Sequence, residues 1–486
     1  MASTINSNIA SLTAQRNLSM SQSSLTMSMQ RLSSGLRVNS AKDDAAGLAI
    51  SDRMTAQIRG SIQAARNAND GISLSQVAEG ALGSASNILQ RVRELAVQSA
   101  NDTNTAADRK SIQAETGQLL TELDRIGTTT QFNGRNLLDG SLGSATFQVG
   151  ANANQTITAT TSNFRTTVYG AQLAQTNLNN ATATATSFAG AVVINGSQTK
   201  SVTLTAADTA ATAAATFNSV SDSTGVTAVA RTMSQFKPLA VGAYALAVTS
   251  SNSTAANITF NVTATGTSAG LAEAVKAFND VSSQTGISAK LNVTSDGLIL
   301  SNEAGDDITL GNNSAANSVS LAAFNAPTSA STGTDTFGAA TTAAAAGTVV
   351  ARGTLEFASD KGFSFGASAS ALVTTSATST LNSVSTIDVS TVSGSTKALK
   401  IVDSALTAVN GQRASFGALQ SRFEASISNL QINTENLSAS RSRIQDADFA
   451  VETSNLSRAQ ILQQAGTAMV AQANQLPQGV MALLRS

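Results

Sequence analysis

The sequence contains no cysteine and no histidine among its 486 residues. The chain therefore has no disulfides, no thiolate nucleophile, no zinc site built from cysteine and histidine, and no Ser-His-Asp triad. We also find no P-loop for nucleotide phosphates. Catalysis by carboxylates alone stays open as an alternative. The absences favour a structural or binding protein with no catalytic residues, no metal and no cofactor.

Aromatic residues and net charge are also scarce. Phe, Trp and Tyr make up 4% of the chain, so alanine, serine, threonine and leucine must carry most of the burial. The formal net charge of −1 lacks the basic excess that nucleic acid or an anionic membrane would favour. We find no apolar run of roughly 18 residues and no N-terminal signal block. We expect no nucleic-acid partner, no membrane span and, if the protein is secreted, a route without signal cleavage.

Charge and proline divide the chain into three zones. Residues 161–395 are poor in charge and rich in Thr, Ser, Ala, Gly and Asn, whereas both flanks are more charged. The three prolines are Pro238, Pro327 and Pro477, so the first zone has none. We expect a fold that is mainly α at the termini, where long coiled-coil helices form a bundle with β-hairpins. The central zone is expected to be β-rich or α+β.

The flanks carry sustained heptads. Steps of four and three from Ala398 to Ile444 meet mostly apolar residues, which indicates a coiled-coil seam about 70 Å long. Two partner helices are predicted in the first zone, one through Ala85, Ile88, Val92 and Leu95, the other through Ile112, Thr116, Leu119, Leu123 and Ile126. Between them, "SANDTNTAADRK" predicts a turn with Thr105 or Asp108 as the N-cap. The glycine-rich "QFNGRNLLDGSLGSATFQVG" then predicts hairpins.

The two ends of the chain carry apolar stripes of their own. The candidate contact residues are Ile5, Ile9, Leu12, Leu25, Leu32, Leu462, Met469, Leu476, Val480 and Leu483. An ordinary intramolecular helix pair is one interpretation. However, two long, thin helices bury too few apolar atoms to offset the entropy lost on ordering them. We therefore favour a self-assembly surface, in which packing offsets Pro477 or the helix bends there.

The central zone contains an internal repeat. "FNSVSDSTGVTA" (217–228) and "FNDVSSQTGISA" (278–289) share most of their residues. Gly225 and Gly286 lie where a helix would end in a left-handed residue. Each copy predicts a strand–helix–strand module, and the two modules occupy residues of about 190–232 and 255–302.

Several stretches of both flanks resemble the bacterial flagellin family. In the first zone they are "INSNIASLTAQRNL", "QRLSSGLRVNSAKDDAAGLAIS", "RNANDGISLSQVAEGAL" and "LQRVRELAVQSAN". In the last zone they are "SRSRIQDADFA" and "QILQQAGTAMVAQANQLPQGVMALLRS". The resemblance covers roughly residues 1–150 and 396–486. The central zone resembles flagellin variable domains by position and through its two repeat modules.

The resemblance implies a structural subunit of the bacterial flagellar filament that serves swimming motility. The implied domains are a terminal coiled-coil inner-tube domain of residues 1–42 and 450–486, a helical spoke domain with β-hairpins of 43–165 and 396–449, and a variable outer region of 166–395. The implied partners are copies of the chain itself, an export chaperone, the type III export apparatus, the filament cap and the hook-junction proteins. The protein would be secreted and extracellular. A hook–filament junction protein and a filament-displayed enzyme are the alternatives.

Recognition by a host is a further implication of the resemblance. The segment "LQRVRELAVQSAN" (89–101) resembles the flagellin segment bound by the animal Toll-like receptor for flagellin. Arg91, Leu95 and Glu115 match the family's main receptor contacts; plain helix surface is the alternative interpretation. The heptad places Leu95 on the apolar seam and leaves Arg91 and Glu115 off it, where they are free to form charge-assisted hydrogen bonds.

Overall fold

The computed structural model describes residues 7–176, 188–292, 296–315, 317–325, 336–366 and 378–483, and from Leu476 onward only the backbone of the last helix. The chain divides into two compact units. The first unit comprises Met1–Gln76, Ser144–Thr160 and Phe416–Ser486, and the second comprises Val77–Gly143 and Thr161–Ser415. Long helices form the terminal zones and strands dominate the centre, which confirms the predicted fold class.

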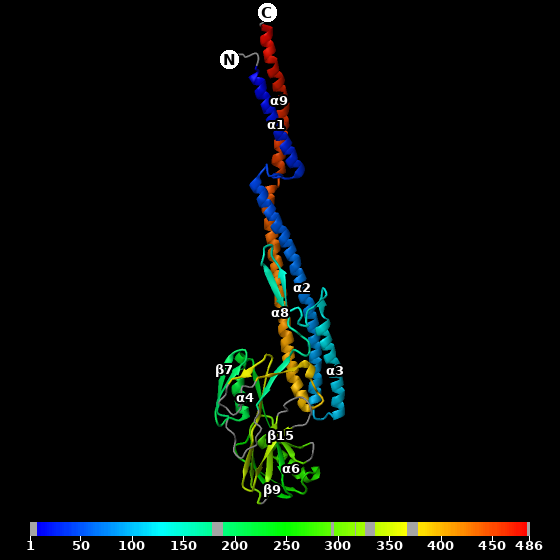
Figure 1. The fold of residues 1–486 in the computed structure, drawn as a ribbon, viewed down its shortest axis with the longest axis vertical. Coiled ribbons are helices and arrows are strands. Elements are labelled where there is room, and N and C mark those ends of the chain that lie inside the picture. The colour runs from blue at the N-terminus through cyan, green and yellow to red at the C-terminus, as the bar shows by residue number, and fades with distance from the viewer. Residues whose placement is uncertain are drawn as a thin grey trace. The chain divides into compact units, whose positions relative to one another are not determined.

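The first unit contains the two terminal helices. Helix α1 (Ile9–Ser34) and helix α9 (Phe449–Leu483) pack side by side and run antiparallel (Figure 1). Asn8 caps α1 by accepting a hydrogen bond from the Ser11 N–H, and Gly35 ends the helix in the left-handed conformation at φ +69°. A residue without Cβ adopts this conformation without steric cost.

The connectors that follow α1 and precede α9 are joined by backbone hydrogen bonds. The Arg37 N–H donates to the Gln445 carbonyl at 2.7 Å, and the Ala447 N–H donates to the Gly35 carbonyl at 2.9 Å. Leu36 and Asp446 form an isolated antiparallel bridge. The segment that leaves α1 is therefore held to the segment that enters α9.

Helices α2 (Ala45–Ala100) and α8 (Val392–Gln445) contribute to both units. In the first unit, the ring of Phe423 is fully buried and lies so close to Gly71 that a Cβ at position 71 would be 2.5 Å from its Cζ. Phe147 packs edge-on against Phe423, with 5.5 Å between ring centroids. Phe147 belongs to the hairpin of β3 (Ser144–Gln148) and β4 (Thr156–Thr160). The glycine thus makes room for an aromatic pair.

In the second unit, α2 and α8 each bury an apolar seam near helix α3 (Ala106–Thr129). Val402, Ala405 and Val409 of α8 are fully buried, which confirms this part of the predicted heptad. The predicted positions Ile88 and Leu119 are only half-buried, and their neighbours Leu89 and Leu120 are buried instead. An α-helix has 3.6 residues per turn, so a straight helix drifts away from a strict heptad and shifts its buried face by one residue.

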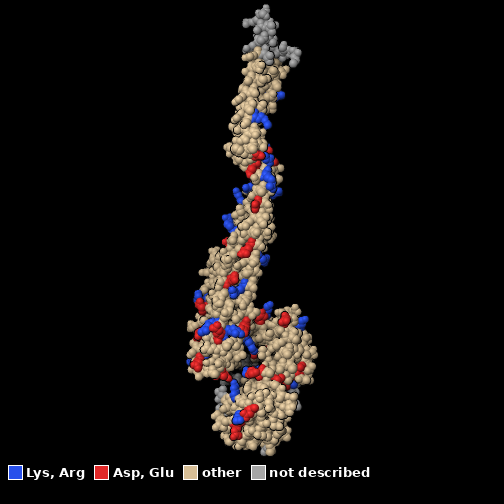
Figure 2. All heavy atoms as spheres, turned by 180° about the vertical axis from the view of Figure 1, so that it is seen from behind, with Lys and Arg blue, Asp and Glu red and all other residues tan. Residues whose placement is uncertain are grey.

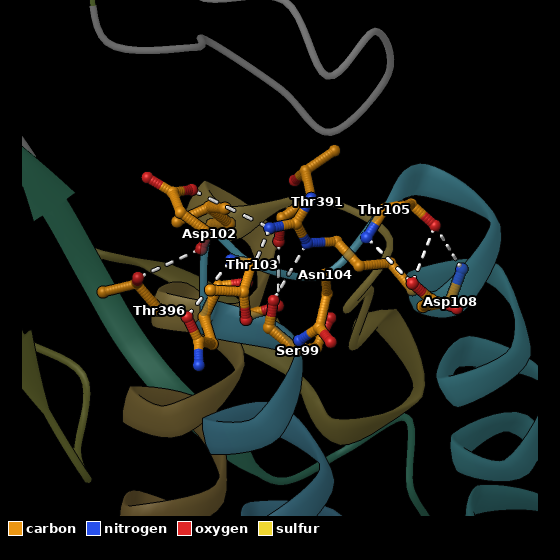
Figure 3. A network of polar contacts seen from close by, with 12 residues as sticks. Ser99, Asp102, Thr103, Asn104, Thr105, Asp108, Thr391 and Thr396 are labelled. Carbon is orange, nitrogen blue, oxygen red and sulfur yellow. Dashed lines mark hydrogen bonds and ion pairs between the residues drawn. The ribbon is translucent and has the colours of Figure 1, made fainter.

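The turn between α2 and α3 is held by a polar network (Figure 3). Thr105 is the N-cap of α3: its hydroxyl accepts from the Asp108 N–H, and the Asp108 carboxylate accepts from the Thr105 N–H at 2.9 Å. This capping box confirms the prediction that Thr105 or Asp108 begins the helix. The Arg109 guanidinium donates to the carbonyls of Ser99 and Asn101, both at 2.9 Å. Carbonyls at the end of α2 that lack a hydrogen-bond donor within the helix thereby accept hydrogen bonds from Arg109.

A second short hairpin follows α3 and confirms the hairpins predicted in this segment. Strands β1 (Gln131–Phe132) and β2 (Arg135–Asn136) pair across Asn133 and Gly134, whose φ angles are +49° and +75°. Two left-handed residues at a two-residue turn match the twist of the flanking strands.

The central zone is built from antiparallel sheets. The largest has the order β11-β12-β8-β17-β5-β19, and β14 pairs with both β8 and β15. Its strands are β5 (Gly170–Gln175), β8 (Thr227–Pro238), β11 (Ser288–Leu291), β12 (Leu298–Asn302), β14 (Val319–Asn325), β15 (Thr336–Ala343), β17 (Thr354–Ser359) and β19 (Thr380–Ser383). A second sheet contains β9 (Gly242–Thr249), β10 (Ala256–Val262), β13 (Ile308–Asn312) and β16 (Thr348–Ala351). A third contains β6 (Gly190–Asn195), β7 (Thr199–Leu204) and β18 (Ser364–Phe365), and a short 3-10 helix η1 (Val384–Thr386) precedes α8.

The two copies of the repeated motif have the same local structure. In the first copy, helix α4 (Ala210–Asn218) is followed by the short helix α5 (Ser221–Thr224), which ends at Gly225. In the second copy, helix α6 (Ser268–Asp280) is followed by α7 (Ser282–Thr285), which ends at Gly286. The φ angles of the two glycines are +71° and +70°, which confirms both as left-handed C-caps.

One asparagine in each motif clamps the strand that follows it. The Asn218 side chain accepts from the Ala228 N–H at 2.7 Å and donates to the Ala228 carbonyl at 2.8 Å. Asn279 binds Ala289 in the same way, at 2.8 and 2.9 Å. Each amide side chain therefore satisfies both backbone groups of one residue in the following strand, as a neighbouring strand would.

Two glycines of α2 provide a test of the packing against Phe423. We expect Gly71→Ala to destabilise the protein by about 1–2 kcal/mol, because the clash with the ring outweighs the gain in helix propensity. Gly80 has open space around its Cα, so Gly80→Ala should stabilise the helix by about 0.5–1 kcal/mol. Thermal unfolding followed by circular dichroism measures both. Equal shifts of the two variants in the stabilising direction would contradict the packing described here.

Candidate assembly surface on the terminal helices

The contact between α1 and α9 uses small side chains. The buried residues of α1 are Ser11, Leu25 and Ser28, and those of α9 are Glu452, Ala459 and Ala473. Between Ala459 and Ala473, a Cβ added to Gly466 would lie 3.1 Å from Cδ1 of Leu18. The α9 positions 452, 459, 466 and 473 repeat every seven residues. They therefore form one inner heptad stripe, through which the two backbones approach closely.

Polar contacts accompany this inner stripe. Ser11 Oγ donates to Asn474 Oδ1 at 2.7 Å, and Gln463 donates to Gln22 at 2.6 Å. Glu452 accepts hydrogen bonds from Ser28 and Arg31, both at 3.0 Å. The two helices thus meet through polar and small groups more than through large apolar ones.

Apart from Leu18, Leu25 and Leu32, most of the described large apolar side chains of the two helices lie away from this contact. Ile9 is 68% exposed, Leu12 60%, Leu462 51% and Met469 59%. The same helices also expose Met20, Met27, Met29, Phe449, Val451 and Ile461. Figure 2 shows few charged side chains over most of the visible face of this helix pair. We call this exposed set the outer apolar face; it includes a shallow groove lined by Thr453, Ser454, Ser457, Arg458, Ile461 and Leu462.

The predicted contact residues are divided between the two sides of the helices. Leu25 is 7% exposed and lies in the inner contact, and Leu32 is half-buried, whereas Ile9, Leu12, Leu462 and Met469 belong to the outer apolar face. Ile5 and the side chains of Leu476, Val480 and Leu483 lie outside the described residues. The inner stripe of α9 was not among the predicted contacts, although its heptad of small residues is visible in the sequence.

The predicted receptor residues lie in the second unit. Arg91 of α2 donates to Glu115 of α3 at 2.8 Å and to Glu94 at 3.0 Å, and about half of each side chain of the Arg91–Glu115 pair is exposed. The hydrogen bond to Glu115 raises the pKa of Arg91. Leu95 is 1% exposed, so it belongs to the buried side of α2.

The acidic side chains after β12 have protein partners. Glu303 pairs with Arg231 at 2.7 Å, and Asp306 accepts from Ser251 at 2.8 Å. Asp307 lies 3.4 Å from Arg352. Burial raises the pKa of Asp307, and the charge of Arg352 opposes that shift. Over the part of the chain that the structure describes, no group of three or more acidic residues is arranged to hold a metal ion.

Long terminal helices whose outer faces are apolar are typical of a self-assembling structural protein. Over the described residues, no helix has an apolar stretch that could cross a membrane. Residues 5–142 match the bacterial flagellin N-terminal helical region, and residues 399–484 match the bacterial flagellin C-terminal helical region.

Full-length relatives agree with these matches. The chain is 40% identical to the B-type flagellin of Pseudomonas aeruginosa, 38% to a flagellin of Salmonella typhimurium and 34% to flagellin B of Vibrio cholerae, and each alignment covers 100% of both chains. The chain belongs to the bacterial flagellin family. It is a structural subunit of the flagellar filament and not an enzyme. These matches favour the filament subunit over the hook–filament junction protein and the filament-displayed enzyme.

Proposed function

We propose that the chain polymerises through the outer apolar face of α1 and α9. The observation that carries this proposal is the exposure of Ile9, Leu12, Leu462 and Met469, each more than half accessible in the single chain. Soluble proteins rarely leave such a contiguous apolar face open unless a partner covers it. Because the opposite side of each helix is already occupied within the chain, the outer face remains for contacts between molecules.

Copies of the same chain are the partners that fit this surface. Burying one large apolar side chain stabilises a contact by about 1.5–3 kcal/mol. Every copy of the chain contributes all the side chains of the outer apolar face to such contacts. A face that contacts a different face of the next copy generates an open helical polymer. Ile5, Leu476, Val480 and Leu483 belong to the proposed contacts on sequence grounds alone, and Leu25 and Leu32 lie on the inner side of the helix pair.

The resemblance to flagellins supports the finer organisation that we propose. Residues 1–42 and 450–486 form the inner tube of the filament, 43–165 and 396–449 form the spoke, and 166–395 face outward. The chain leaves the cell through the type III export apparatus with an export chaperone and without signal cleavage. It joins the extracellular filament beneath the cap, next to the hook-junction proteins. The absence of cysteine supports export as an unfolded chain, because no disulfide can form first.

We propose a second function for the surface of α2 and α3: recognition by host flagellin receptors. The supporting observation is that Arg91 and Glu115 lie together and half-exposed, whereas Leu95 is buried. Arginine at the centre of an interface is a frequent hot spot, since its planar group binds carboxylates through two hydrogen bonds. The same surface faces neighbouring subunits in the filament, so the receptor binds the monomer.

The assembly proposal is tested by charging the outer apolar face. Leu462→Asp and Met469→Asp should each slow polymerisation at least about tenfold, because a carboxylate would be buried without a partner between subunits. Val229→Asp is the matched control: Val229 is an exposed apolar residue of β8, 52% accessible, and lies outside the terminal helices. Sedimentation of polymer after seeding measures the rate. Polymerisation of all three variants at the wild-type rate would refute the proposal.

The receptor proposal is tested with monomeric protein on reporter cells. Arg91→Ala should lower potency about 30-fold, which corresponds to about 2 kcal/mol, and Glu115→Ala should also lower it. Arg125→Ala removes an exposed arginine that pairs with Glu122 elsewhere on α3, and it should keep full potency. Equal potency of the three variants would remove Arg91 and Glu115 from the binding site, and a silent wild type would refute recognition altogether.

A further inference from the structure

The contact of α1 with α9 contains one buried charge. The carboxylate side chain of Glu452 is 8% exposed, and it accepts a hydrogen bond from the Ser28 hydroxyl and one from Arg31 Nη1, both at 3.0 Å. Other polar contacts between the described parts of the two helices join uncharged groups, as between Ser11 and Asn474 and between Gln463 and Gln22. A carboxylate buried without its partner would be strongly unfavourable, so Glu452 is tied to the position of Arg31.

The same pair also suits the electrostatics of both helix ends. Arg31 lies in the last turn of α1, and Glu452 lies in the first turn of α9. A cation stabilises the C-terminus of a helix and an anion its N-terminus. In this antiparallel pair the two ends meet, so one ion pair satisfies both helices at once.

The apolar part of the contact does not by itself select a single alignment, so the register depends on polar contacts and on the hydrogen bonds between the two connectors. Leu18, Leu25 and Leu32 of α1 repeat every seven residues, as do Ala459, Gly466 and Ala473 of α9. After a slide by one heptad, leucines would again face small residues: Gly466 would meet Leu25, and Ala473 would meet Leu18. The same slide would separate Glu452 from Arg31. A single polar position within a repeating seam is a known way to specify register.

We propose that Arg31 and Glu452 are positioning residues that fix the register of α1 against α9. By fixing this register, the ion pair sets which apolar side chains of the two helices stand beside each other on the outer apolar face. The proposal rests on the assembly function proposed above. The ion pair joins two helices of the same chain.

Register is measured directly by disulfide formation. Gly466 lies opposite Leu18, and a Cβ at position 466 would be 3.8 Å from the Leu18 Cβ, which matches the spacing of a disulfide. The full chain carrying Leu18→Cys and Gly466→Cys therefore reports the native register. The chain carrying Leu25→Cys and Gly466→Cys reports a slide of one heptad. Because the natural chain has no cysteine, no other disulfide competes.

Charge reversal is then combined with each cysteine pair. A denaturing gel without reductant distinguishes a disulfide within one chain from a disulfide between two chains. Samples of polymer and of unassembled chain are both measured in this way. In the otherwise unchanged protein, we expect the native pair to form and the slid pair to stay reduced. Arg31→Glu or Glu452→Arg alone should lower the native disulfide at least fivefold, raise the slid one and slow polymerisation. Together the two reversals should restore most of the native disulfide and of the polymerisation rate, with a remaining deficit because the swapped pair opposes both helix dipoles.

Two further variants distinguish the loss of the Arg31–Glu452 ion pair from unfolding and from an unspecific change of charge. Glu452→Gln keeps the size of the side chain and can still accept from Ser28, so it should fold yet show the slid disulfide. Glu122→Arg disrupts the exposed pair with Arg125 and should leave both disulfides unchanged.

The register proposal is overturned if the single reversals keep the native disulfide, whether or not they polymerise, or if the double reversal fails to restore it. An unaltered register in Leu462→Asp, combined with normal polymerisation of that variant, would instead overturn the assembly proposal alone.

Discussion

The close pairing of α1 with α9 through small side chains is the constraint on which the rest of the structure depends. A Cβ added to Gly466 would lie only 3.1 Å from Leu18 Cδ1, and the small residues Ser11, Ala459 and Ala473 are buried. The leucines, methionines and isoleucines of the opposite sides, such as Leu462, Met469 and Ile461, are exposed in the single chain. In the assembly that we propose, neighbouring copies cover them.

The remaining parts of the chain bury their large side chains internally. Phe416 and Phe423 of α8 are almost completely buried, and the two central modules have their own clusters around Phe236 and Phe357. Helix α8 is also tied to β17 by an ion pair of 2.6 Å between Lys400 and Glu356. The large aromatic side chains are therefore buried in α8 and the central modules, whereas the terminal helices, which we propose as the assembly surface, keep large apolar side chains exposed.

Much of this organisation was predictable from local patterns. The α8 heptad, the Thr105 cap and the two glycine C-caps follow from spacing and from the conformations that single residues prefer. The division of the terminal apolar residues between two sides was not predicted, because α9 carries two heptads and the stripe of large residues hid the stripe of small ones. The sheet order was not predictable either: β5 pairs with β17 and β19, far along the chain, and no local signal encodes such pairs.

Methionine oxidation in monomer and in polymer tests the central claim most directly. Met27, Met29 and Met469 are exposed on the terminal helices, whereas Met233 is buried in the central zone. Oxidation by peroxide follows exposure of the thioether. If the outer apolar face joins neighbouring subunits, the three exposed methionines should oxidise at least about tenfold more slowly in filaments than in monomers, with Met233 slow in both. Equal rates for Met469 in the two states would contradict assembly through this face.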